Sequence, residues 1–463
     1  MVFRQLIRRL GTITRLAVVA ASLATVVSFS YFAATYLVSR DGTVSTSTYT
    51  SPLTSTVSKD DTTCLNPYAQ KGYVWFSDKR EEINTTWVPF YSGLLNQKYA
   101  AAWNEDGSPA EPVFNAADVY SDDRPPSEVL DTTPHKWMQD IARLHLLLLK
   151  GSMIDEDGIR IEPGKKGKEL TVDEQNEIKE LEQRLFWVKH RRIVILSDSV
   201  ERYQHAFLCG RLGQAPVIGP YGAQTTTWCH VPYLNFTVLH WHLSSTSTSR
   251  PDWWWLSEMK VVPIEERWKK YYLPTVNLTI GVNGKSPDLV IFQSSLWDHR
   301  MFVEARRADK HEFGLDLHRP LNWRELRFYM QRIRYIVGLF RELYGDDFPL
   351  LYRATTLRRE KFGNVGLYDL GRAARFVAHE LDIEIMEFGQ MVQGYEQFYF
   401  DIVHIGKGPL SVLWANMVFW YLFRALGGVE VKGQLVRMPN ESGPYKLIDN
   451  WDVCHDVYMK DPK

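Results

Sequence analysis

The sequence predicts an α/β protein with a mainly parallel sheet flanked by helices, preceded by a single N-terminal transmembrane helix. Three observations predict this class. The chain has 463 residues, of which 45% are hydrophobic and 13% aromatic, and this composition supports a large packed core. From residue 191 onward, short apolar runs alternate with longer amphipathic stretches. A stretch of 24 uncharged residues lies close to the N-terminus.

The charge and cysteine content argue against two classes of protein. Lysine and arginine together number 54, and aspartate and glutamate 55, so the formal net charge is −1 and no general basic surface indicates a nucleic-acid partner. Four cysteines are too few for a disulfide-dense scaffold, although they suffice for two bridges. The sequence has no phosphate-binding glycine loop and no zinc-type cysteine pairs, and we expect no cofactor and no metal.

Residues 16–39 are the predicted membrane anchor. At a rise of ~1.5 Å per residue, a helix of this length spans the ~30 Å hydrocarbon core of a bilayer. Four arginines precede it in residues 1–15, whereas Arg40 after it is offset by Asp41, so we expect the short tail in the cytosol. A cleaved signal peptide is the alternative, but its apolar region would be shorter, about 7–15 residues. We favour an uncleaved type II anchor.

Residues 40–63 are the predicted stem between the anchor and a luminal domain. Thirteen of the 23 residues from 41 to 63 are serine or threonine, and such a segment has too little apolar area to offset its ordering entropy. Four glycosylation sequons lie beyond it, at Asn84, Asn235, Asn277 and Asn440. Together with the anchor, these sequons favour the membrane of the Golgi or endoplasmic reticulum, with the domain in the lumen.

The four cysteines are expected to oxidise in that compartment. We would pair Cys209 with Cys229, which are close in sequence, and Cys64 with Cys454, which would tie the two ends of the domain together. Three pairings are possible, and the sequence does not choose among them.

The luminal part divides into three segments. Residues 64–190 are irregular, with a predicted helix at 134–150 and a charged, exposed loop at 155–175. Residues 191–426 carry the strand and helix alternation of the core, and 427–463 form a C-terminal extension.

Within the core, apolar and β-branched runs predict five strands, at 193–196, 236–239, 289–292, 350–352 and 383–386. Apolar residues at three- and four-residue spacing predict amphipathic helices at 323–343 and 370–381, and a strongly apolar helix is expected at 410–426. Alternation of this kind indicates a mainly parallel sheet covered by helices, in which ligands sit outside the carboxyl ends of the strands.

The segment 191–202 contains the first candidate for chemistry. It reads RRIVILSDSVER, so we expect a buried strand to end at Ser197 and a helix to begin near Ser199. A serine there lies at the carboxyl end of the strand and at the positive pole of the helix, which favours a developing oxyanion. The alternative is that Asp198 or Ser199 only caps the helix.

A serine nucleophile needs a base, and the base needs an orienting carboxylate. Asp401 and His404, three residues apart before the last predicted helix, can supply both. A second pair with this spacing, Asp452 and His455, flanks Cys454 in a tail with no helix after it. We interpret that second pair as disulfide-anchored structure.

Three segments together carry a family resemblance. They are Ser197-Asp-Ser-Val-Glu-Arg202, the run from 287 to 298 that ends in Gln293-Ser-Ser-Leu-Trp-Asp298, and Asp401-Ile-Val-His404. In this order they resemble the SGNH, or GDSL-like, hydrolase superfamily, and most closely its PC-esterase and trichome-birefringence-like branch of membrane-anchored fungal and plant proteins. That branch has a Gly-Asp-Ser-Val-x-Arg motif, a small-residue-Leu-Trp-Asp segment and a late Asp-x-x-His.

The resemblance implies a flavodoxin-like, three-layer fold and a serine-dependent site. By it, Ser199 would be the nucleophile, His404 the general base and Asp401 its orienting partner. The residues that it implies for the oxyanion or for substrate binding are Gln293, Asp198, Arg202, Trp297 and Asp298.

The chain also departs from the family pattern. Ser197 replaces the first glycine, Gln293 the oxyanion-hole asparagine and Ser295 the glycine that follows it, and no glycine is visible after the second strand at 240–243. Losing one oxyanion donor costs on the order of 10²–10³ in rate. A catalytically impaired relative that binds glycans is therefore an alternative.

Other side-chain groups favour packing or solvated loops over chemistry. Asp155 and Asp157 form an Asp-x-Asp like that of Golgi glycosyltransferases, but they lie in a charged insertion. His240 and His242 alternate on a strand with no third metal ligand in view, and Trp253-Trp-Trp255 is expected to pack, with a carbohydrate surface as its other interpretation.

We therefore expect a secretory-pathway type II membrane protein whose luminal domain acts as an O-acyl (acetyl) esterase or acyltransferase. Its partners would be a glycan or cell-wall polysaccharide substrate and an acyl donor. A glycan-binding relative without activity and, less favoured, a Golgi glycosyltransferase are the alternatives.

Overall fold

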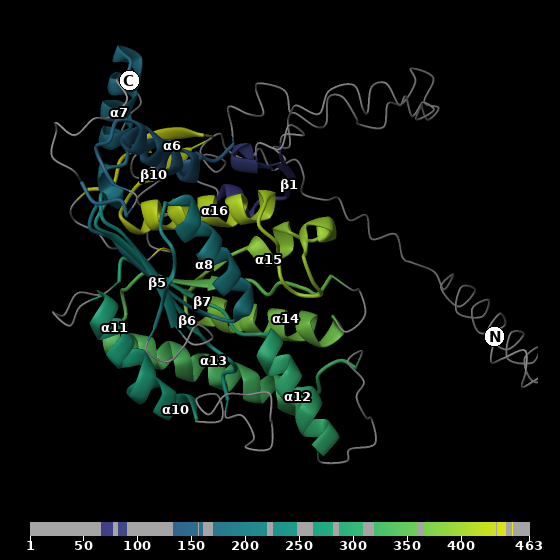
Figure 1. Cartoon of the computed structure of the whole chain (residues 1–463). Helices are drawn as coiled ribbons and strands as arrows, with labels where there is room; N and C mark the ends of the chain where they lie inside the picture. The colour runs from purple at the N-terminus through teal and green to yellow at the C-terminus, as the bar shows by residue number, and fades with distance from the viewer. Residues whose placement is uncertain are drawn as a thin grey trace, which may run out of the picture. The chain divides into compact units, whose positions relative to one another are not determined.

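The computed structural model describes residues 66–76, 82–89, 133–155, 157–160, 170–219, 226–247, 263–280, 287–308, 319–359, 364–431, 433–440 and 447 (Figure 1). The predicted anchor and stem lie outside these residues. Among the helices that are described, none combines the length and the apolar character needed to cross a membrane.

A central sheet of seven strands organises the described part of the chain. Its order is β4-β5-β6-β3-β7-β8-β9. The strands are β3 (Arg192–Ser197), β4 (Val217–Ile218), β5 (Thr226–Val231), β6 (Phe236–His242), β7 (Leu289–Phe292), β8 (Leu350–Arg353) and β9 (Glu384–Met386). The five strands from β6 to β9 in this order run parallel, and β5 and β4 are antiparallel additions at one edge. The prediction of a mainly parallel sheet is confirmed.

The order of the parallel strands explains where a site can form. The chain passes from central β3 to β6 on one side, then crosses to β7 on the other. This is the 2-1-3-4-5 order of flavodoxin-like sheets, which opens a crevice at the carboxyl ends of the strands where the direction of winding reverses. That point lies beside the end of β3, where Ser197 is the last strand residue.

Alternating strand residues face two separate hydrophobic layers. Ile193 and Ile195 of β3 pack into one cluster, whereas Val194 and Leu196 pack into the other. This follows from the two-residue period of a strand, and it makes the sheet the middle of three layers. The continuous apolar run in β3 is typical of a parallel strand buried on both faces.

One helical layer covers the face that Ile193 and Ile195 reach (Figure 1). Its helices are α6 (Trp137–Lys150), α7 (Val172–Arg184), α8 (Ser199–Arg211), α15 (Phe388–Met391) and α16 (Pro409–Ala425). Every residue of α16 is buried. This burial explains why the sequence there is apolar all around the helix instead of along one stripe.

The second layer covers the opposite face. It contains α10 (Ile264–Arg267), a π-helical turn (Trp268–Tyr272), α11 (Leu273–Ile280), α12 (Leu296–Ala308), α13 (Trp323–Tyr344) and α14 (Val365–Glu380). Helix α13 begins with a capping box between Asn322 and Glu325 and ends before Gly345, whose φ of 89° suits glycine.

The segments on either side of the core pack against it. They contribute the hairpins β1 (Gly72–Trp75) with β2 (Thr86–Pro89) and β10 (Val429–Val431) with β11 (Gln434–Arg437). Short 3-10 turns cover Pro67–Ala69, Glu82–Asn84, Phe186–Val188 and Glu396–Phe398. The Asn66 side-chain amide donates to Tyr421 Oη at 2.9 Å, and Met138 N–H donates to Asn416 Oδ1 at 2.9 Å. Both acceptors lie on α16.

The predicted elements of the core are all present, with ends shifted by a few residues. One expectation was partly wrong: the charged loop predicted at 155–175 includes the start of α7. Thr171 accepts a hydrogen bond from Glu174 N–H, and the Glu174 carboxylate accepts one from Thr171 N–H. This capping box starts the helix at Val172.

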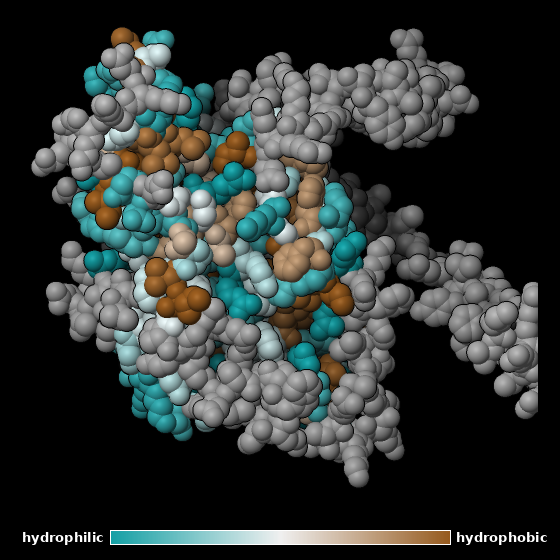
Figure 2. Space-filling model, viewed as in Figure 1, coloured by the Kyte–Doolittle hydropathy of each residue, from teal (hydrophilic) through white to brown (hydrophobic). Residues whose placement is uncertain are grey.

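Large exposed apolar residues occur on several elements of the described part of the chain. On the face that Figure 2 presents, hydrophobic patches alternate with hydrophilic ones. Large apolar residues that are at least half exposed include Leu146, Ile218, Trp323, Phe376 and Phe400. Of these, Phe400 lies beside the residues described next.

Candidate active site

Ser199 lies where β3 gives way to α8. Asp198 is the N-cap of this helix, because its Oδ1 accepts a hydrogen bond from Val200 N–H at 2.9 Å. Ser199 is therefore the first helical residue, and the N–H groups of a first turn have no partner within their helix. The capping alternative thus applies to Asp198, and the Ser199 hydroxyl is used elsewhere.

The Ser199 hydroxyl contacts an imidazole 205 residues further along the chain. Ser199 Oγ lies 2.7 Å from His404 Nε2, and His404 Nδ1 lies 2.6 Å from Asp401 Oδ2. Both distances are within hydrogen-bonding range. The structure thus brings together the three side chains that the sequence selects as a nucleophile, a base and an orienting carboxylate.

The second oxygen of Asp401 shapes the loop that carries His404. Asp401 Oδ1 accepts hydrogen bonds from Val403 N–H at 2.8 Å and His404 N–H at 2.7 Å. Burial raises the pKa of Asp401, but the hydrogen bonds from the His404 side chain and from these N–H groups outweigh it, so the pKa is lowered overall. The group is therefore ionised and can hold Nδ1–H in place.

Neighbouring elements hold the His404 loop on two sides. From α8, Gln204 Nε2 donates to Ile405 O at 3.2 Å. From the segment after β8, Arg359 N–H donates to Ile402 O at 2.7 Å. Within the loop, Gly406 N–H donates to Phe398 O at 2.8 Å.

Two aromatic rings flank the imidazole. Phe400 stacks on His404 with ring centroids 5.5 Å apart and an interplanar angle of 13°, and Tyr203 meets His404 edge-on at 4.7 Å. Phe400 is 54% exposed and Tyr203 40%, so both also present apolar surface beside the reactive nitrogen. The guanidinium of Arg202 lies 5.4 Å from the Tyr203 ring.

Gln293 is the residue directly after β7, the strand that neighbours β3 on the side away from β6. It is fully buried, and its N–H donates to Leu196 O at 3.0 Å. The side-chain Nε2 donates to Ser295 Oγ, and Oε1 has no partner among the described residues. Burial raises the pKa of Asp198, and Arg353 and a hydrogen bond from Gln293 are among the interactions that oppose this rise. Gln293 thus lies next to the N-cap of the nucleophile helix.

The segment after β6 is fixed by Asp298. The Asp298 carboxylate is fully buried, and its Oδ1 accepts hydrogen bonds from Thr246 N–H at 2.9 Å, Thr246 Oγ1 at 2.6 Å and Ser245 Oγ at 3.1 Å. Its Oδ2 accepts one from Ser294 Oγ. Asp298 therefore joins the loops after β6 and β7 from inside the protein. Trp297, which the family resemblance also implied, makes an edge-on contact with His242, with ring centroids 6.0 Å apart.

Ser244 lies in that anchored segment, and sequence reasoning missed it. Residues Ser197 and His242 are register partners, and Leu243 N–H donates to Ser197 O at 2.6 Å, so Ser244 is held at the same sheet edge as Ser199. Its hydroxyl is buried without a partner among the described residues. The sequence signal was a pair of serines directly after residues 240–243, the stretch in which no glycine is visible.

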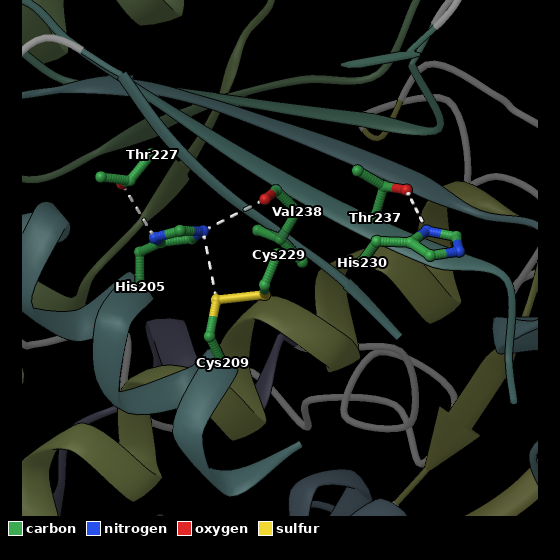
Figure 3. The surroundings of a disulfide bond; sticks show 7 residues. All are labelled: His205, Cys209, Thr227, Cys229, His230, Thr237 and Val238. Atoms are coloured by element: carbon green, nitrogen blue, oxygen red, sulfur yellow. Dashed lines mark hydrogen bonds between the residues drawn. A yellow bond between two sulfur atoms is a disulfide. The ribbon is translucent and has the colours of Figure 1, made fainter. Parts of the chain in front are cut away.

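The structure joins Cys209 to Cys229, the pairing favoured by their closeness in sequence. Figure 3 shows the His205 ring beside this disulfide, with its Nε2 3.1 Å from Val238 O and 3.4 Å from Cys209 Sγ. His205, Cys209 and Cys229 are the one group of three potential metal ligands in the described part of the chain. Both sulfurs are oxidised, so they offer no thiolate to a metal. Burial lowers the pKa of His205 to about 4, which keeps the ring neutral.

The remaining candidates occupy ordinary structural positions or fall outside the described residues. His240 Nε2 lies 3.2 Å from Asp198 O, and Asp155 Oδ1 accepts a hydrogen bond from Ile159 N–H at 2.8 Å in a loop. Among the sequons, Asn235 and Asn440 are exposed, Asn84 lies in a 3-10 turn and Asn277 in α11. The candidates that lie outside the described residues are Cys64, Trp253, Trp254, Trp255, Asp452, Cys454 and His455.

No protein-family description matches the chain, and no curated protein matches it. Among solved structures, the acetylxylan esterase from Geobacillus stearothermophilus is similar with a TM-score of 0.30 and 14% identity, covering 50% of this chain and 94% of that chain. A putative GDSL-like lipase from Parabacteroides merdae has a TM-score of 0.30 and 13% identity, covering 50% of this chain and 96% of that chain. An α/β hydrolase from the metagenome of Lake Arreo has a TM-score of 0.30 and 14% identity, covering 51% of this chain and 97% of that chain.

Proposed function

We propose that this protein is a serine-dependent acyl-transfer enzyme, an O-acyl esterase or acyltransferase. The observation that carries the proposal is the unbroken hydrogen-bonded chain from Ser199 through His404 to Asp401, placed at the start of α8 and at the carboxyl edge of the sheet. Helix caps need only one such side chain, and Asp198 already fills that role, so capping does not account for the arrangement.

The chemistry follows from the roles of these atoms. His404 Nε2 takes the proton of Ser199 Oγ as the oxygen bonds to the ester carbonyl carbon, and Asp401 stabilises the imidazolium. The oxyanion would accept a hydrogen bond from Ser199 N–H at the positive end of α8. The Gln293 amide and the Ser244 hydroxyl would be further donors. His404 then gives its proton to the departing alcohol, which leaves an acyl-enzyme. Water or a second hydroxyl accepts the acyl group in the reverse sequence.

The substrate class is an O-acylated, and by preference O-acetylated, glycan or cell-wall polysaccharide. The departing alcohol must lie beside His404 Nε2, because that nitrogen protonates it. Tyr203 and Phe400 are exposed at this place, and a ring with an apolar face and polar edges can pack on such side chains. The resemblance to the PC-esterase branch, the predicted anchor and the sequons support the same substrate class and a luminal position in the Golgi or endoplasmic reticulum.

Covalent labelling tests the proposal. A serine-directed fluorophosphonate should label wild-type protein, and Ser199→Ala should abolish the label while leaving the thermal unfolding transition in place. Ser411→Ala is a matched control, because it removes a serine hydroxyl that donates to Gly406 O at 2.9 Å and is not bonded to Ser199, His404 or Asp401. Folded wild-type protein that remains unlabelled would overturn the assignment.

A glycan-binding relative without activity is a second candidate, and the Gln293 side chain favours it. Its Nε2 uses one of its two N–H bonds for Ser295 Oγ, so at most one N–H bond remains for an oxyanion. Under this alternative, binding of an acetylated oligosaccharide by calorimetry is unchanged in Ser199→Ala and His404→Ala, and no acetate is released by the wild type.

A further inference from the structure

A buried pair of charged side chains lies close to the candidate site and has no role in the proposed proton transfers. Glu201 is two positions after Ser199 on α8, and Arg353 is the last residue of β8. Arg353 Nη2 lies 2.5 Å from Glu201 Oε2, and neither side chain has any exposed surface. Removing two charges from water carries a large desolvation penalty, so a buried pair of this kind is weak evidence of added stability.

The positive charge of Arg353 acts on a second buried carboxyl group besides that of Glu201. Burial raises the pKa values of Glu201 and Asp198, and the positive charge of Arg353 opposes both shifts. One guanidinium therefore serves two carboxylates, one of which caps the nucleophile helix at its start. The bond between Glu201 and Arg353 joins the first turn of α8 to the end of β8, and the same positive charge favours the ionised form of Asp198.

Arg353 also shapes the segment that follows β8. Its Nη1 donates to Ala354 O at 2.7 Å and to Thr356 Oγ1. Gly389 fits closely against this turn, because a Cβ placed there would lie 2.2 Å from Thr355 O. The turn is thus defined from within by the guanidinium and from outside by close backbone packing.

The same segment supports the loop that carries His404. Tyr399 Oη donates to Leu357 O at 3.3 Å, and Arg359 N–H donates to Ile402 O at 2.7 Å. On the other side, Gln204 of α8 holds Ile405 O. The His404 loop therefore rests on α8 and on the segment after β8, and the Glu201–Arg353 pair joins these two supports to each other.

We propose that Glu201 and Arg353 are positioning residues that set the separation between the Ser199 hydroxyl and the His404 imidazole. This inference rests on the proposed function, because it concerns the same serine and histidine. Neither side chain touches substrate. The pair acts through α8 on one side and through the segment 354–359 on the other.

A double substitution separates positioning from stability. Replacing both partners of a buried ion pair by well-packed apolar residues is often tolerated. Because Asp198 also loses the positive charge of Arg353, we expect Glu201→Met with Arg353→Met to fold with an unfolding temperature at or below that of the wild type. Measured well below that temperature, the rate of fluorophosphonate labelling at Ser199 should fall about 10- to 100-fold, as expected for a small misplacement of reacting groups. With an ester substrate, kcat should fall and KM should change little.

The matched control is the ion pair between Arg424 and Glu384, which joins α16 to the start of β9. It is also nearly buried, with Nη1 2.6 Å from Oε1, and it lies at the opposite end of the strands from Ser199. Glu384→Met with Arg424→Met should leave the labelling rate unchanged. If the double Met variant of the Glu201–Arg353 pair labels at the wild-type rate, the positioning role is wrong.

A conservative variant keeps the test valid if the double variant does not fold. Arg353→Lys keeps the charge beside Glu201 but loses the planar fork that reaches Ala354 O and Thr356 together. It should label several-fold more slowly than wild type, and a wild-type rate in folded Arg353→Lys would also contradict the inference. Wild-type protein that takes no label at all would instead overturn the proposed function, so the two failures are distinguishable.

Discussion

The Asp401 carboxylate divides its two oxygens between different partners. Oδ2 receives Nδ1–H of His404, and Oδ1 receives the N–H groups of Val403 and His404. Because Nδ1 keeps its proton towards Asp401, Nε2 is the nitrogen that can accept the proton of Ser199. The backbone contacts fix the loop, and the side-chain contact fixes the tautomer.

This division predicts the effect of Asp401→Asn. The amide oxygen can keep the two backbone hydrogen bonds, so the loop should fold, but the amide nitrogen opposite Nδ1 favours the wrong tautomer. We expect kcat for ester cleavage to fall on the order of 10³–10⁴, as in other triads, with an unchanged unfolding temperature. Steady-state kinetics and thermal denaturation measure both. Activity within tenfold of wild type would contradict the assigned role.

Single residues differ in how far the sequence reveals them. Ser199, Asp401 and His404 could be selected because their residue types and local spacing carry chemical meaning. Arg353 and Ser244 could not, because their importance arises from neighbours that are distant in sequence. An arginine at the end of an apolar strand gives no sign that its partner lies 152 positions earlier.

Helix α8 is the element on which the site depends most. It carries Ser199 at its start and Cys209 near its end, and the disulfide to Cys229 ties it to β5. Both cysteines are buried, and His205 between the two ends is bonded to Val238 O of β6. The helix is thus fixed to the sheet at both ends.

Removal of the disulfide should therefore lower stability without removing the site. Closing a loop of 20 residues stabilises a protein by about 3 kcal/mol in the chain-entropy account. Cys209→Ala with Cys229→Ala should lower the free energy of unfolding by about this amount in urea titrations. The Ser199 label should persist in the folded variant, because the N-cap contact of Asp198 remains. An unchanged urea midpoint would contradict the stabilising role of this bridge.

The predictability of elements depended on how strongly they are buried. The five parallel strands could be predicted because short apolar or β-branched runs alternate with helical stretches, and α16 because its apolar run is long. Helix α7 could not, because only Ile178 and Leu181 of its 13 residues are buried and its other positions are mostly charged or polar. Its capping box, Thr171 with Glu174, was the signal that would have found it.

On the scale of the whole molecule, remote parts of the chain meet over α16. His135 N–H, just before α6, donates to Glu430 Oε1 of β10 at 2.9 Å. The strand and helix alternation predicted the sheet, but it gave no sign of this contact between an early and a late segment. Contacts of this kind need a third element, here the buried α16, on which both segments pack.

Glu430 gives this assembly a predictable dependence on pH. Its carboxyl group is enclosed, Oε2 has no partner among the described residues, and burial raises the pKa of Glu430 to about 8. The folded protein therefore holds a proton that the unfolded chain releases near the ordinary glutamate range. Stability from this group is full at low pH and falls as pH rises towards the folded value.

Glu430→Gln should remove that dependence. At pH 5 both proteins carry a neutral group, so their free energies of unfolding should be similar. Between pH 5 and pH 8 the wild type should lose on the order of a few kcal/mol relative to the variant. Urea unfolding at several pH values measures the difference. The control is Glu177→Gln, because a hydrogen bond from Arg143 lowers the pKa of Glu177 and its substitution should give no such gain. If the plots of unfolding free energy against pH for wild type and Glu430→Gln stay parallel from pH 5 to pH 8, the prediction is wrong. The carboxyl group of Glu430 would then be ionised in the folded protein over this whole range.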